Sequence, residues 1–61
     1  MDKITYEIVK EVTGNEEAWF AREKGGLFVD GTYTRMGQLA CKALLERYVG
    51  KREAVVEEVE L

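Results

Sequence analysis

A helical pattern between residues 34 and 49 constrains this sequence most, because no other stretch is long and apolar enough to cover a sheet. Its apolar residues recur at the i, i+3 and i+4 spacing of a helix face that lies on a core. We expect the core-facing stripe to contain Met36, Leu39, Ala40, Ala43 and Leu44.

A second apolar group widens this stripe around the predicted helix, and its members are Cys41, Leu45, Tyr48 and Val49. One small sheet cannot cover so wide an arc, so a second layer must contact it. That layer is the C-terminal segment folded back, a second copy of the chain, or a different protein.

Two runs before the helix alternate as strands do. Residues 3–12 separate apolar from polar side chains, and residues 17–23 carry Trp19 and Phe20 on opposite faces. The Thr-Gly-Asn-Glu sequence between them is typical of a hairpin turn.

A glycine pair at 25–26 predicts a second tight turn, followed by a third strand at 27–29 whose extension to Tyr33 is left open. The hydroxyl of Thr32 or Thr34 is expected to cap the helix, and Gly50 to end it.

The C-terminal segment 53–61 contains three valines, whose β-branching favours a fourth strand, although their spacing also suits a short helix. We predict the strand. The chain is therefore expected to be a single α+β domain over residues 1–61. Its architecture would be a three-stranded antiparallel meander with one helix across a face and a fourth, C-terminal strand (β-β-β-α-β).

The composition limits how so small a domain becomes stable and what chemistry it performs. Small domains usually add disulfides, a metal or an oligomeric contact. With one cysteine and no histidine the chain offers no disulfide framework and no zinc site, so oligomerisation remains. Because it lacks both histidine and serine, Ser-His-Asp and Cys-His nucleophiles cannot be built from this chain alone. We predict a non-enzymatic protein without cofactor or metal, in which Cys41 is a small apolar residue.

Charge is segregated along the chain, which has a formal net charge of -3. Residues 1–30 sum to −3, residues 31–52 to +4 and residues 53–61 to −4. An acidic tail after a basic helix predicts attraction between the two, within a chain or between chains, with solvated charge as the alternative. No stretch reaches the ~18 apolar residues of a membrane span, and no signal-peptide layout is present, so we expect a soluble cytoplasmic protein.

The run YEIVKEVTG, then WF, then GTYTRMGQLACKAL resembles the strand-strand-strand-helix half of a double-stranded-RNA-binding domain, with loose matches at Gly31, Arg35, Gln38, Ala40 and Leu44. This resemblance implies nucleic-acid binding through the basic segment 31–52. We keep it as the alternative function, with candidate contacts at Arg35, Lys42, Lys51 and Arg52. The acidic overall charge argues against a binder of duplex phosphates.

A second resemblance rests on three short motifs, AWFA at 18–21, GLF at 26–28 and GT at 31–32. Their strand-glycine-strand-glycine order before a helix is similar to that of the HicB-type antitoxin, a partial RNase-H-like unit with the order β-β-β-α-β. The resemblance implies a protein that binds a toxin and pairs with itself.

The favoured function is a small acidic protein–protein interaction domain, homodimeric through its helix, which acts as a regulator or inhibitor of the phage or mobile-element type. Aromatic and apolar anchors commonly dominate such contacts. The predicted partner-binding residues are Trp19, Cys41, Leu45, Tyr48 and Val49.

Overall fold

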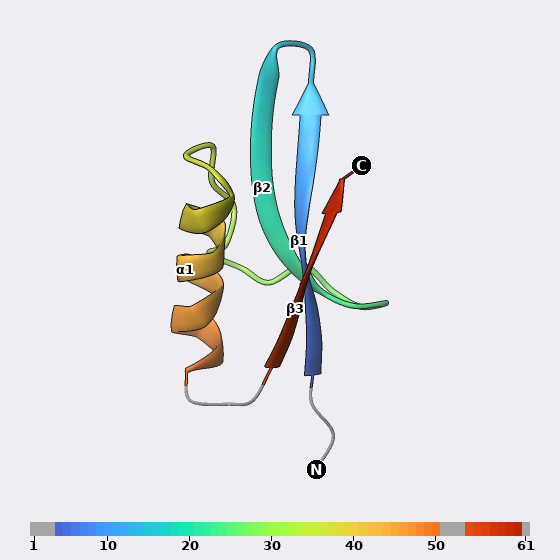
Figure 1. The fold of residues 1–61 in the computed structure, drawn as a ribbon, viewed down its shortest axis with the longest axis vertical. Coiled ribbons are helices and arrows are strands. Elements are labelled where there is room, and N and C mark those ends of the chain that lie inside the picture. The colour runs from blue at the N-terminus through green and yellow to red at the C-terminus, as the bar shows by residue number, and fades with distance from the viewer. Residues whose placement is uncertain (1–3, 51–53, 61) are drawn as a thin grey trace.

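The computed structural model describes residues 4–50 and 54–60, which form one sheet with a helix on its face (Figure 1). The elements are β1 (Ile4–Thr13), β2 (Glu16–Glu23), α1 (Gln38–Val49) and β3 (Ala54–Glu60). The strand order is β2-β1-β3, with β2 antiparallel and β3 parallel to β1. The predicted α+β class is confirmed. The sheet is mixed because the chain crosses over through α1 before it forms β3.

The hairpin of β1 and β2 is confirmed where the alternating pattern predicts it. Thr13 pairs with Glu16, so Gly14 and Asn15 form the turn between the strands. Gly14 has a φ of 63°, a conformation that glycine adopts without steric cost. Local sequence is therefore sufficient to explain this element.

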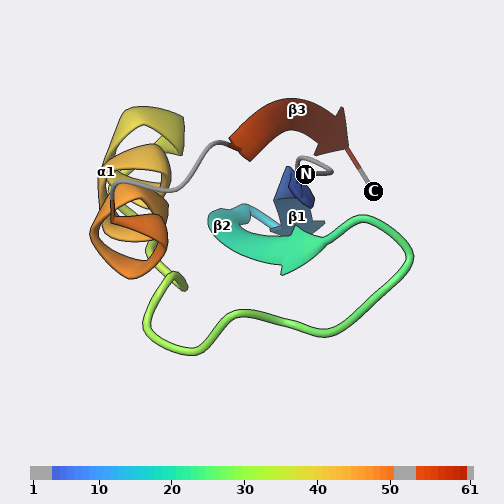
Figure 2. The ribbon, with the colours of Figure 1, turned by 90° about the horizontal axis from the view of Figure 1, so that it is seen from below.

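The segment after β2 differs from the predicted third strand. It contacts the outer edge of β2 through two isolated bridges, Arg22 with Phe28 and Trp19 with Thr34. Gly31 lies between these bridges with a φ of 85°, which interrupts an extended conformation. Figure 2 shows this segment running along β2 on the side away from β1. It covers the edge of β2 as an irregular loop.

α1 begins at Gln38, one turn later than predicted. Gly37 has a φ of 136°, which is not helical, so the helix cannot begin before Gln38. No side chain caps this N-terminal end of the helix. Neither predicted threonine cap is correct. The Thr34 hydroxyl accepts a hydrogen bond from the Met36 N–H at 3.1 Å, and Thr32 is buried in the loop.

The C-terminal end of α1 is confirmed at Gly50. Gly50 has a φ of 68°, and its N–H donates to the Glu46 carbonyl at 2.8 Å.

Among the described residues, no helix has the length and apolar character that crossing a membrane requires.

α1 faces the sheet with Cys41, Leu45 and Val49, three of the residues that were predicted to contact a partner. Met36 and Leu39, predicted to face the core, are 88% and 82% exposed. The predicted core stripe is therefore wrong. Met36 lies before the helix, so the predicted stripe loses its first member. The buried residues Cys41, Leu45 and Val49, by contrast, are spaced by four residues and continue to the end of the helix. The core cluster consists of Tyr6, Ile8, Ala21, Val29, Cys41, Leu45 and Val49.

β3 confirms the predicted C-terminal strand. Its register with β1 places Val56 beside Tyr6 and Glu58 beside Ile8, so these side chains share the face that α1 covers. Val56 packs on the core while Glu58 is exposed, because the apolar half of β3 lies nearer the end of α1.

Candidate functional site

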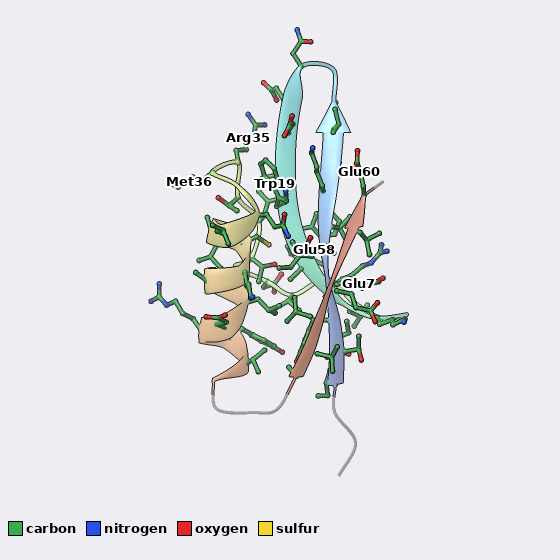
Figure 3. All side chains as sticks on the ribbon, in the orientation of Figure 1. Glu7, Trp19, Arg35, Met36, Glu58 and Glu60 are labelled. Atoms are coloured by element: carbon green, nitrogen blue, oxygen red, sulfur yellow. The ribbon has the colours of Figure 1, made fainter. Side chains whose placement is uncertain are left out.

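The five residues predicted to bind a partner do not form one accessible surface. Cys41, Leu45 and Val49 are buried in the core of the chain, so the structure corrects their assignment as a contact surface. Trp19 is half-buried and packs on the same core, between α1 and the strands (Figure 3). Tyr48 remains exposed at the side of α1, with its ring edge-on to Tyr6 at a centroid distance of 6.5 Å.

The side of α1 that points away from the sheet carries the most exposed apolar residues of the helix region. Leu39 and Ala43 lie one turn apart on this side, and Met36 lies at the N-terminal end of the helix (Figure 3). These three residues are called the α1 outer face below. In the sequence, Gly37 indicates that Met36 lies outside the helix, whereas helix periodicity does not distinguish Leu39 and Ala43 from the buried residues of α1.

The opposite face of the sheet is closed by aromatic packing and ion pairs. The rings of Phe20 and Phe28 pack at a tilt of 57° with their centroids 5.7 Å apart, so the loop after β2 covers part of this face. Leu27 projects from that loop and is 83% exposed. Two ion pairs cross the strands, Arg22 to Glu7 at 3.0 Å and Lys24 to Glu57 at 3.4 Å. These two pairs neutralise four charged side chains in this part of the molecule.

The basic residues proposed to contact nucleic acid do not gather on one described face. Arg35 lies beside the hairpin and pairs with Glu16 at 3.2 Å. The pKa of the Arg35 guanidinium is raised, mainly by a hydrogen bond to Tyr33 and to a smaller extent by the negative charge of Glu16. Lys42 lines a different cleft, between α1 and β3. Lys51 and Arg52 lie outside the described residues, so nucleic-acid binding stays a prediction.

A groove separates α1 from β3 and contains two clefts. The one near the end of α1, of ≈ 380 Å³, is lined by Leu45, Val49, Ala54 and Val56, with Lys42 and Glu46 beside them. The other, of ≈ 280 Å³, lies near Trp19 and Gln38 and is lined on the strand side by Ile8 and Lys10 of β1 and by Glu58, Val59 and Glu60 of β3. The groove therefore changes from apolar to acidic along β3.

Reactive and metal-binding groups are sparse among the described residues. Burial raises the pKa of the Cys41 thiol, which disfavours the thiolate that a nucleophile or metal ligand requires. Within residues 4–50 and 54–60, no three carboxylate or thiol groups converge to hold a metal ion.

Comparisons of this chain with protein-family models, with curated proteins and with solved structures found no match. The resemblances to the double-stranded-RNA-binding domain and to the HicB-type antitoxin therefore stay predictions. Function has to be inferred from the residues of this chain.

Proposed function

We propose that this chain is a non-catalytic protein–protein interaction domain that self-associates through the α1 outer face and acts as a regulator or inhibitor. The observation that carries the proposal is the exposure of Met36 and Leu39, at 88% and 82%, beside the exposed Ala43. Single exposed apolar residues are ordinary on protein surfaces, whereas neighbouring ones on a helix form a patch that a partner can cover.

The energetics of the α1 outer face suit a symmetric dimer. Fully burying a Met or Leu side chain contributes about 1.5–3 kcal/mol, and a two-fold axis buries each residue twice. Ala43, the last residue of the face, has a small side chain, which lets two helices approach closely. The next turn of α1, beyond the face, carries Glu46 and Arg47, whose opposite charges impose no net repulsion between two copies.

The test is the molar mass in solution over a range of protein concentrations, by light scattering or sedimentation equilibrium. The wild type is expected to dimerise. Leu39→Glu removes both buried copies of Leu39, so the dissociation constant should rise by at least about 100-fold. The matched control is Leu27→Glu, because Leu27 is equally exposed but lies on the loop on the other side of the sheet (Figure 2).

Two results would contradict the proposal. One is a wild type that stays monomeric at high micromolar concentration. The other is a dimer that Leu27→Glu dissociates and Leu39→Glu does not. Leu45→Glu does not test this surface, since it would place a carboxylate in the core and unfold the chain.

A further inference from the structure

The two outer edges of the sheet differ in whether the chain covers them. The loop after β2 covers the β2 edge, where the N–H groups of Trp19 and Thr34 each donate to the carbonyl of the other residue at 2.8 Å. Further along, the Val29 N–H donates to the Ala21 carbonyl at 2.9 Å. β3 forms the other edge, and no strand of the described residues lies beyond it (Figure 2). An uncovered edge presents N–H and C=O groups to which another strand can bind.

The side chains of β3 show which strand fits there. β3 contains three glutamates and no basic residue. Glu58 and Glu60 are exposed, and Figure 3 shows them along the strand. Lys10 lies beside Glu60 in the register and lines the same cleft as Glu58 and Glu60, but its amine pairs with Glu17 at 3.6 Å. With the Lys10 charge paired in this way, the second half of the edge is net acidic on the side that faces α1.

The opposite side of β3 is more apolar. Val55 is 41% exposed and Val59 is half-buried on this side, and the charge of Glu57 between them is paired with Lys24. Side chains of an added strand alternate between the two sides and lie next to those of the strand they join. Basic residues would therefore meet Glu58 and Glu60, while apolar residues would meet the valines.

We propose that the β3 edge binds an extended, cationic segment of another protein, in which basic and apolar residues alternate, as an added strand of the sheet. A second copy of β3 fits less well, because it would double the carboxylates at the edge without adding a cation. This binding goes beyond the proposed self-association, since it uses a different surface and a different partner.

The probe is a blocked peptide of about eight residues, a usual strand length, in which lysine and valine alternate. It is titrated into isotopically labelled protein, and the amide signals are followed by NMR. We expect the largest shifts in β3, and we expect affinity to fall as salt rises. A peptide with glutamate in place of lysine is expected to bind at least about tenfold more weakly.

N-methylation tests whether the peptide binds as a strand. In a strand, the N–H groups of alternate residues point to the same edge. One peptide is methylated at every lysine and another at every valine, so a strand added in one direction predicts that one of them loses affinity by at least about tenfold and the other binds. A third peptide, methylated at every residue, cannot donate to β3 in either direction. Undiminished binding of this third peptide would overturn the proposal, as would no binding of the unmethylated peptide at millimolar concentration.

Charge reversal locates the site. Glu58→Lys with Glu60→Lys should weaken binding by at least about tenfold, because both residues are exposed and attraction becomes repulsion. Glu23→Lys with Asp30→Lys changes the net charge equally at exposed positions away from β3 and should bind as the wild type does. Equal loss in the two double variants would overturn the site.

Leu39→Glu separates this proposal from the proposed dimer, since the variant should be monomeric and still bind the peptide. If its β3 amides are instead protected without peptide in a persisting dimer, a second copy occupies the edge. That result would overturn the proposed cationic partner.

Discussion

Replacement of Thr32 with valine should destabilise the fold by about 2–6 kcal/mol, because one buried hydroxyl joins the loop after β2 to the sheet. The Thr32 side chain is fully buried. Its hydroxyl accepts a hydrogen bond from the Ala21 N–H at 2.9 Å and donates one to the Val29 carbonyl at 2.7 Å. Valine has nearly the same shape, so the change removes these hydrogen bonds without leaving a cavity.

The expected magnitude follows from the groups that lose their partner. A buried donor or acceptor left unpaired costs about 1–3 kcal/mol, and Thr32→Val leaves one of each. A domain of this length has a total stability of only about 3–9 kcal/mol. The substitution should therefore remove a large share of the unfolding free energy.

Urea denaturation of the wild type, Thr32→Val and Thr32→Ser measures the effect. Serine keeps the hydroxyl and removes one methyl group, so it should cost about 1 kcal/mol. Hydrogen exchange of the Ala21 amide gives a local reading and should accelerate in the valine variant alone. The reasoning would be refuted if the valine variant were as stable as the wild type, or more stable than the serine variant.

Three further predictions test the helix and its end. Leu45 is buried and Leu39 is exposed, so in urea denaturation Leu45→Ala should lower the unfolding free energy by about 2–5 kcal/mol and Leu39→Ala should change it by less than about 0.5 kcal/mol. The reverse order would mean that α1 faces the sheet with its other side. Because burial raises the pKa of the Cys41 thiol, the folded state holds its proton longer than the unfolded chain does. The unfolding free energy should therefore fall as the pH rises above the ordinary value of 9.0, and more steeply in the wild type than in Cys41→Ala. Gly50→Ala should lower the unfolding free energy by about 1–3 kcal/mol, because the φ of 68° is strained for alanine, although the added Cβ would meet nothing within 4 Å. A loss of unfolding free energy below about 0.5 kcal/mol would argue against this conformation.

Local chemistry explains the elements that could be predicted. The hairpin follows from alternation and from Gly14 and Asn15, whose conformations need no distant contact. The end of α1 follows from Gly50, and the strand in the C-terminal segment from its β-branched valines. Each of these signals lies within a few residues of the element that it determines.

The face of α1 could not be predicted because apolar residues occupy most of its circumference. The stripe with Leu39 and the row with Leu45 are both apolar, so helix periodicity does not distinguish them. Which of them meets the sheet depends on where the loop from β2 places the helix over the strands. The predicted interface was therefore assigned to residues that are in the core.

The sequence by itself determined the α+β class, the hairpin, one helix ending at Gly50 and a C-terminal strand, because turn glycines, alternation and β-branching act locally. Only the tertiary structure decided that β3 lies parallel to β1 and forms an acidic open edge, and that Met36 and Leu39 point outward. These features depend on contacts between segments far apart in the chain. Such contacts compete for the same apolar surface, and only the packing of the whole molecule selects among them.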